Sequence, residues 1–114
     1  MDSCLFCSII RGELHSEVIY QDELSVAFRD INPQAPVHVL IVPREHVVSL
    51  AEATAEDERL LGHLLRVATA LAEKEGILTR GYRTVINTNK EAGQSVYHIH
   101  VHLLGGRYMG WPPG

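Results

Sequence analysis

The sequence has few basic residues for its length, and this shortage excludes one class of partner. Ten lysines and arginines stand against fourteen aspartates and glutamates, so the formal net charge is −4. Proteins that bind a nucleic-acid backbone usually have a basic surface, because their affinity comes from displacing counterions along many phosphates. We therefore expect no nucleic-acid partner, and we expect any bound phosphate to belong to a small molecule.

Long apolar runs are missing as well. The longest clean runs, such as residues 39–42, are far shorter than the roughly 20 residues that a membrane helix needs. The N-terminal Met1-Asp2-Ser3 lacks the basic start of a signal peptide. These features predict no membrane association and a cytoplasmic protein, a setting in which thiols stay reduced.

Only two cysteines are present, Cys4 and Cys7, and two residues separate them. This spacing is typical of metal or redox sites and not of a structural disulfide. A redox site of this kind would need a thioredoxin-like βαβ pattern, which the sequence does not show. The pair is therefore interpreted as half of a tetrahedral zinc site, with two small buried thiols as the alternative.

The chain of 114 residues, 46% of them apolar, is long enough for one domain with its own core. Thr54 and Asp57 resemble a capping box, and Gly76 is a natural helix stop. Five strands in hairpin order, with one long and one short helix, predict an α+β fold with an antiparallel sheet. Apolar patterns predict the strands over residues 18–20, 25–29, 38–42, 82–87 and 97–104, the helices over 4–10 and 55–75, and an irregular tail over 105–114.

Alternating histidines precede this tail. Because alternate side chains of a strand share a face, His98, His100 and His102 are predicted to point in one direction. The apolar residues between them then point into the core. Three imidazoles on one face are costly for packing alone, because each ring nitrogen needs a polar partner.

Two chemical interpretations follow from these histidines. They could hold a catalytic metal with an open coordination position, or one imidazole could attack phosphorus near neutral pH. The turn Gly93-Gln94-Ser95 favours attack on phosphorus, because its backbone amides can cradle a phosphate and Ser95 can donate a hydrogen bond. A purely metal-based site would not need this turn.

The segment over residues 94–104 resembles the signature of the histidine-triad (HIT) superfamily. Residues 28–38, 41–46 and 111–114 resemble its Hint branch, the nucleoside phosphoramidate hydrolases, so the similarity extends over essentially the whole chain. The resemblance implies one HIT domain over residues 1–114, with a HIT-like α+β fold.

The implied activity is hydrolysis of the P–N bond of purine nucleoside 5′-phosphoramidates, derivatives of AMP or GMP, through a nucleotidyl-histidine intermediate. No catalytic cofactor is expected. The alternatives are a diadenosine polyphosphate hydrolase and a nucleotide-binding regulatory protein with little catalysis.

The resemblance also implies roles for individual residues. His100 would be the nucleophile, His102 and His38 would contact the phosphate and its leaving group, and Ser95 would help to protonate the departing amine. Asp30 would bind the ribose hydroxyls. The other implied nucleotide contacts, besides Ser95, His100 and His102, are Ile31 at the base and Asn87, Gly93 and Gln94 at the sugar and phosphate.

Two further expectations come from the resemblance. Bacterial-type members that keep the cysteine pair suggest that His46 and His98 join Cys4 and Cys7 around a structural zinc ion. Hint-like proteins are homodimers in which the tail nears the partner's active site, so Trp111 is expected to contact the pocket of the partner subunit. Two histidines match nothing in the family and are interpreted as ordinary surface or helix-face residues: His15 and His63.

Overall fold

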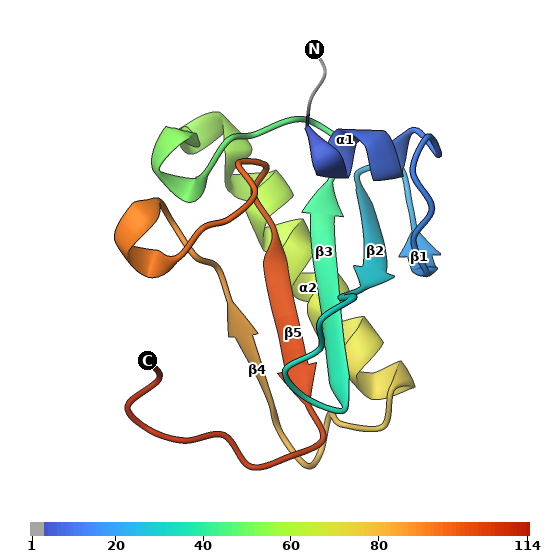
Figure 1. Ribbon diagram of the computed structural model, residues 1–114, viewed down its shortest axis with the longest axis vertical. Helices are drawn as coiled ribbons and strands as arrows, with labels where there is room; N and C mark the ends of the chain where they lie inside the picture. The colour runs from blue at the N-terminus through green and yellow to red at the C-terminus, as the bar shows by residue number, and fades with distance from the viewer. Residues whose placement is uncertain (1–3) are drawn as a thin grey trace.

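The computed structural model describes residues 4–114, in which a five-stranded antiparallel sheet lies between a long and a short helix (Figure 1). The strand order is β1-β2-β3-β5-β4, so β1 and β4 form the edges. Residues 1–3, which carried the expectation about a signal peptide, lie outside the described part. The helices are α1 (Leu5–Ile10) and α2 (Glu58–Lys74), and the strands are β1 (Val18–Gln21), β2 (Ser25–Arg29), β3 (Val37–Pro43), β4 (Tyr82–Val85) and β5 (Val101–Gly105).

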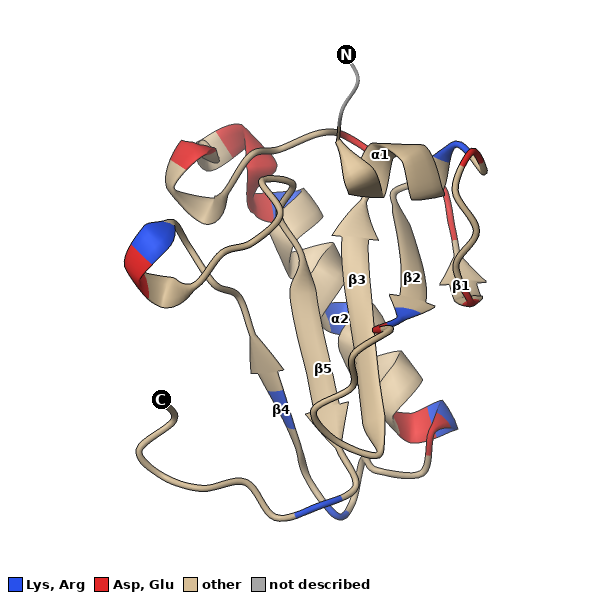
Figure 2. Ribbon diagram, in the orientation of Figure 1, with Lys and Arg blue, Asp and Glu red and all other residues tan. Residues whose placement is uncertain are grey.

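Both faces of the central strands are buried, each against a different helix. In β3, Val39 and Ile41 pack with α2, whereas Leu40 and Val42 pack with Phe6 of α1. This alternation is the two-residue period of a strand. No charged residue occurs in β3 or β5, and the charged residues lie mainly around the periphery of the sheet (Figure 2).

The long helix begins and ends where the sequence predicts, apart from its first turn. Residues 55–57 form a 3₁₀ turn, so α2 proper starts at Glu58. The Asp57 carboxylate accepts a hydrogen bond from the Thr54 backbone N–H at 2.9 Å, which confirms the capping box. Gly76 adopts a φ of 79°, the left-handed conformation that ends many helices.

His63 ties this helix to the hairpin between β1 and β2. Its Nε2 lies 2.8 Å from Oδ2 of Asp22, an oxygen that also accepts a hydrogen bond from the Tyr20 hydroxyl. The other carboxylate oxygen of Asp22 accepts from the backbone N–H groups of Leu24 and Ser25. Although burial opposes it, this set of donors holds the pKa of Asp22 well below its usual range. His63 is thus a helix-face residue with a specific structural partner.

The predicted strand over residues 97–104 was too long at its N-terminal end and too short at its C-terminal end. Regular pairing starts at Val101, because the backbone N–H of Ile99 donates instead to the carbonyl of Val47 at 2.7 Å. Gly105 belongs to β5 and not to the irregular tail, since it pairs with both β3 and β4. A Cβ at Gly105 would collide with Cδ1 of Ile77, so a larger residue at this position would require the Ile77 side chain to shift.

The remaining boundaries differ by a few residues. Strand β4 ends at Val85, and the predicted extension to residue 87 was wrong. Residues 106–114 form neither helix nor strand, as predicted. Within residues 4–114, no helix combines the length and the apolar character that a bilayer crossing requires.

Candidate functional site

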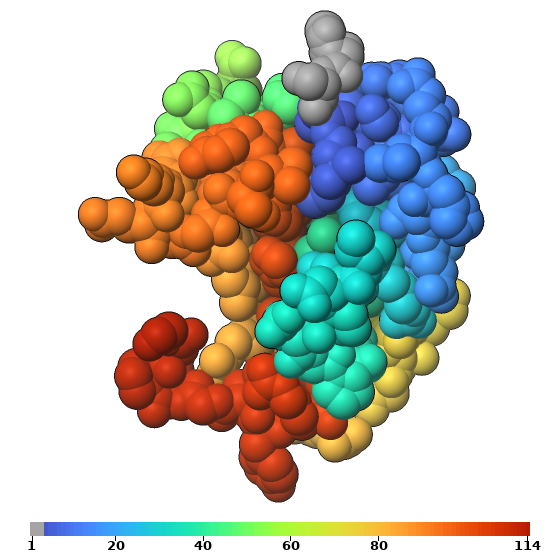
Figure 3. All heavy atoms as spheres, in the orientation of Figure 1, coloured from blue at the N-terminus to red at the C-terminus, as the bar shows by residue number. Residues whose placement is uncertain are grey.

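A pocket of about 340 Å³ opens on the face of the sheet that α1 covers. Figure 3 shows a hollow on this face between α1, the segment that follows β2 and the segment that precedes β5. Its lining combines apolar and polar side chains, which is typical of a site for a small amphipathic ligand. The apolar lining is Leu5, Phe6, Ile9, Leu14, Phe28, Ile31, Leu40 and Val96, and the polar lining is His15, Ser16, Arg29, Asp30, Ser95, His100 and His102.

His100 lines this pocket with only 5% of its surface exposed. Its Nδ1 lies 2.8 Å from the carbonyl oxygen of His98. A carbonyl can only accept, so Nδ1 carries the proton and Nε2 of the neutral ring has a free lone pair. Burial lowers the pKa of His100, which keeps the ring neutral at pH 7. A neutral imidazole with a bare Nε2 is the form that acts as a nucleophile.

His102 stands beside His100, with ring centroids 5.0 Å apart. Its Nδ1 lies 2.9 Å from Nε2 of His38, and the same His38 nitrogen lies 3.4 Å from a carboxylate oxygen of Asp30. Burial, together with the neighbouring rings of His100 and His38, lowers the pKa of His102 to about 4. Burial also lowers the pKa of His38. The pocket therefore presents neutral imidazoles at pH 7.

The turn before the histidines is held together by the side chain of Gln94, a residue that was predicted to contact the nucleotide. Gln94 is buried, and its side chain accepts from the Asn89 N–H and donates to the carbonyls of Val48 and Val96. Its amide group thus holds the turn in shape, and the backbone N–H groups of Gly93 and Gln94 also donate within the turn, to the carbonyls of Lys90 and Asn89. Gly93 is exposed with a φ of 83°, which favours glycine.

The structure brings together most of the residues that the sequence singled out. Asp30, Ile31, Ser95, His100 and His102 all line the pocket. His38 reaches the pocket through its contact with His102. The lining does not include Asn87, Gly93 or Gln94, so their contacts with a nucleotide stay predictions.

Most of the apolar residues that line the pocket were not predicted from the sequence. Leu5, Phe6 and Ile9 lie on one side of α1, and a helical spacing of apolar residues was their only signal. Phe28 and Leu40 come from neighbouring positions of β2 and β3. His15 also lines the pocket, although the sequence offered no reason to place it there.

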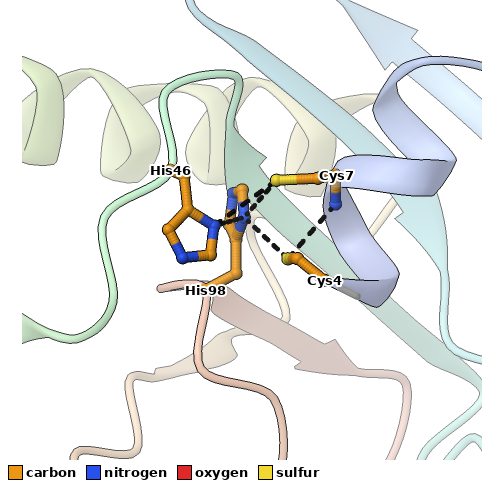
Figure 4. Close-up of side chains that lie close together, drawn as sticks. All are labelled: Cys4, Cys7, His46 and His98. Atoms are coloured by element: carbon orange, nitrogen blue, oxygen red, sulfur yellow. Dashed lines mark hydrogen bonds between the residues drawn. The ribbon is translucent and has the colours of Figure 1, made fainter. Parts of the chain in front are cut away.

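Cys4, Cys7, His46 and His98 form a second cluster beside the pocket (Figure 4). Nδ1 of His98 lies 3.4 Å from Sγ of Cys4, 3.6 Å from Sγ of Cys7 and 3.1 Å from Nδ1 of His46. Tetrahedral zinc bonds of about 2.3 Å to sulfur and 2.0–2.1 Å to nitrogen place donor atoms about 3.3–3.8 Å apart. The donor set and its spacing therefore fit a zinc ion.

The orientation of His98 also fits a metal ligand. The ring is fully buried, and its Nε2–H donates to the carbonyl of Pro43 at 2.8 Å. This bond leaves the lone pair of Nδ1 pointing into the cluster, and a backbone carbonyl is a common partner for the second nitrogen of a ligand histidine. Burial and the adjacent Cys4 raise the pKa of the Cys7 thiol, so a metal would have to displace its proton.

Comparisons with known proteins agree with this geometry. A family model described as "HIT domain" matches residues 11–109. "Purine nucleoside phosphoramidase" of Escherichia coli is 50% identical over 96% of this chain and 92% of its own length. The "14 kDa zinc-binding protein" of Zea mays is 54% identical over 96% of this chain and 87% of its own. A crystal structure of a "HIT family hydrolase" from Legionella pneumophila superposes with a TM-score of 0.97 at 50% identity, covering 98% of this chain and all of that one.

The buried imidazoles predict that stability falls in mild acid. Because the folded pKa of His102 is about 4, below the value of about 6.5 in an unfolded chain, the unfolded state binds more protons between these values. The free energy of unfolding should therefore decrease as the pH falls from 6.5 towards 4. Urea unfolding at a series of pH values measures it.

The matched pair for this measurement is His102→Asn and His15→Asn. Replacing His102 should flatten the pH dependence of the unfolding free energy, whereas replacing the exposed His15 should leave it as in the wild type. Protonation of the Cys/His cluster affects all three proteins equally and cancels in the comparison. An unchanged pH dependence in His102→Asn would contradict the prediction.

Proposed function

The chain belongs to the HIT family, and from this premise we propose that it hydrolyses the P–N bond of purine nucleoside 5′-phosphoramidates. The observation that carries the proposal is the bare Nε2 of His100, held in a pocket that also has many apolar side chains in its lining. The name of the Escherichia coli relative supports the same reaction. The proposal treats residues 1–114 as one HIT domain.

The reaction proceeds in two displacements at phosphorus. In the first, Nε2 of His100 attacks, the P–N bond to the amine breaks, and Ser95 donates a proton to the departing nitrogen. In the second, water attacks the nucleotidyl-His100 intermediate, the bond from phosphorus to Nε2 breaks, and the water returns a proton to Ser95. His102 stabilises the phosphoryl oxygens, where negative charge develops, and His38 acts on them through its hydrogen bond with His102.

The rest of the pocket holds the nucleoside of AMP or GMP derivatives. Asp30 accepts hydrogen bonds from the ribose hydroxyls, next to the histidines. Ile31 is 95% exposed at the rim, and an apolar side chain in that position gains by covering a purine. The predicted contacts of Asn87, Gly93 and Gln94 with sugar and phosphate belong to this proposal. No catalytic cofactor takes part.

His100→Ala should lower phosphoramidate hydrolysis by about 10⁴-fold or more, because no other group can form the covalent intermediate. Turnover of adenosine 5′-phosphoramidate measures the loss, and intact-mass spectrometry of rapidly quenched wild type should detect the nucleotidyl adduct. His15→Ala is the control for a histidine that lines the same pocket. Normal turnover, or an adduct, in His100→Ala would refute the assignment.

We infer in addition that Cys4, Cys7, His46 and His98 hold one structural zinc ion. The spacing of their donor atoms and the name of the Zea mays relative support this. The ion would stabilise the N-terminal segment and the chain near His98, with no part in the bond-breaking steps. A reducing, cytoplasmic location belongs to this inference, since zinc needs both thiolates.

Cys4→Ser should lower the melting temperature more than it lowers the rate at low temperature, because the free energy of zinc binding adds to that of folding. Metal analysis of untagged wild type should give one zinc per chain. Ser8→Ala on the same helix is the control for substitution in α1. A wild-type protein that is fully stable without bound metal would refute the inference.

A homodimer is the third part of the proposal. Strand β4 is an edge strand, and the space-filling view shows a deep notch between the tail and residues 90–97 beside it (Figure 3). Arg83 of β4 holds the tail, donating to the Gly110 carbonyl at 2.9 Å with its guanidinium carbon 5.9 Å from the Trp111 ring centre. Tyr108 and Trp111 are 100% and 83% exposed, which favours a partner surface.

Deleting residues 110–114 should change the preference among amine leaving groups more than the affinity for the bare nucleoside monophosphate. The reason is that Trp111 of one protomer would shape the leaving-group side of the other protomer's pocket. The measurement is kcat/KM for several phosphoramidates, with dimerisation followed by light scattering. A monomeric full-length protein, or an unchanged leaving-group profile in a truncated dimer, would exclude the idea.

A further inference from the structure

We propose that the backbone N–H of Gln34 fixes the tautomers of His38 and His102, and so makes Nε2 of His102 a permanent hydrogen-bond donor in the pocket. Gln34 is then a positioning residue that acts through His38. The inference rests on the proposed function only for what His102 donates to, a phosphoryl oxygen.

The first link is a backbone hydrogen bond to a buried ring. The Gln34 N–H donates to Nδ1 of His38 at 3.0 Å, and an amide N–H cannot accept. Nδ1 must therefore be the bare nitrogen of His38, and the proton of the neutral ring lies on Nε2. His38 is only 5% exposed, so water cannot readily replace this donor.

The second link passes the choice to His102. The proton on Nε2 of His38 has two acceptors, Nδ1 of His102 at 2.9 Å and a carboxylate oxygen of Asp30 at 3.4 Å. The shorter contact is the hydrogen bond, because 3.4 Å is outside the usual range for N–H donors to oxygen. Nδ1 of His102 thus accepts, and the proton of its neutral ring lies on Nε2.

His100 receives the opposite tautomer from an opposite backbone group. The carbonyl of His98 places the proton of His100 on Nδ1 and leaves Nε2 bare. Adjacent rings in one pocket, with centroids 5.0 Å apart, therefore present a lone pair and an N–H. A lone pair can attack phosphorus, and an N–H can stabilise the oxygen that gains charge.

The tautomer of His38 also bears on a second group of side chains that could bind a metal. Asp30, His38 and His102 lie close enough together to hold an ion. A metal on Nε2 of a neutral His38 would require the proton on Nδ1, the atom to which Gln34 N–H already donates. The backbone at Gln34 thus favours a hydrogen-bonded histidine pair over a metal site.

The loop that carries Gln34 is held from several directions. Asp30 accepts from the Asn32 N–H at 2.8 Å, and the Gln34 side chain donates to the Asn32 carbonyl at 3.0 Å. Arg107 donates to the Gln34 carbonyl at 3.0 Å from beyond β5. Pro33 and Pro36 restrict the backbone on both sides. These contacts keep the Gln34 N–H directed at His38.

The test replaces the N–H while keeping the fold. Gln34→Pro removes the donor, and Gln34→Ala is the matched control because it loses only the side chain. Nitrogen-15 NMR of the histidine rings distinguishes bare from protonated nitrogens in the free protein. Wild type and Gln34→Ala should show His38 and His102 protonated at Nε2, whereas Gln34→Pro should show a mixture of tautomers for both rings.

The kinetic arm measures what the fixed donor contributes. In Gln34→Pro, kcat for phosphoramidates should fall about tenfold, corresponding to one hydrogen bond of about 1.4 kcal/mol. The fall should be much smaller in Gln34→Ala, which keeps the N–H and loses only the exposed side-chain bond to the Asn32 carbonyl. If Gln34→Pro does not fold, a backbone ester at residue 34 removes the same N–H without a ring. It should give the same mixture of tautomers.

Each outcome decides a separate point. His38 protonated at Nδ1 in wild type, or unchanged tautomers in the variant that lacks the N–H, would overturn the inference. Mixed tautomers with an unchanged kcat would overturn the role of His102 as the fixed donor. Because NMR needs no turnover, the expected tautomers in a protein that cleaves no phosphoramidate would refute the proposed function and leave the tautomer assignment standing.

Discussion

The hydrogen bond between Nδ1 of His100 and the carbonyl of His98 is the contact on which the arrangement of the site depends. The bond is local, but the carbonyl is held in place by a ring that is fully buried. Nε2 of His98 is anchored to Pro43 at the end of β3, and its Nδ1 faces the two cysteines. The position of His100, the proposed nucleophile, is therefore linked to the N-terminal helix through a single residue.

This link explains why the chain leaves the sheet at this point. A regular strand through residues 98–100 would place all three histidine side chains in the same row. The structure instead ends the pairing at Val101, and the Ile99 N–H pairs with Val47 outside the sheet. His98 can then turn into the Cys/His cluster while His100 and His102 line the pocket. The irregular backbone thus directs His98 to the Cys/His cluster and His100 and His102 to the pocket, although the three histidines lie within five residues.

The elements that depend on local patterns were predictable, and those that depend on contacts distant in sequence were not. The capping box at Thr54 and the stop at Gly76 are local, so α2 was predicted correctly apart from its first turn. Spacing indicated the cysteine pair and the row of alternating histidines, whereas other members of the two sites, such as His46 and Asp30, were expected only from the family resemblance. The structural role of Gln94 and the place of Gly105 in β5 were missed, because they follow from a hydrogen bond to Val48 and from pairing with β3 and β4 that the sequence does not reveal.

The charge distribution connects the pocket to the acidic composition of the chain. Among the described residues that line the pocket, Arg29 is the one lysine or arginine, and it is bound at 3.0 Å to Glu75. A phosphate in this pocket would therefore meet neutral imidazoles, a hydroxyl and backbone groups in place of free cations. Such donors stabilise charge by their orientation, and orientation matters most where water is excluded. The backbone groups that set each ring's tautomer orient these neutral side chains towards a phosphate, which is the role that fixed charges have in a basic site. Oriented neutral donors suit a single phosphoryl group better than a long polyanion.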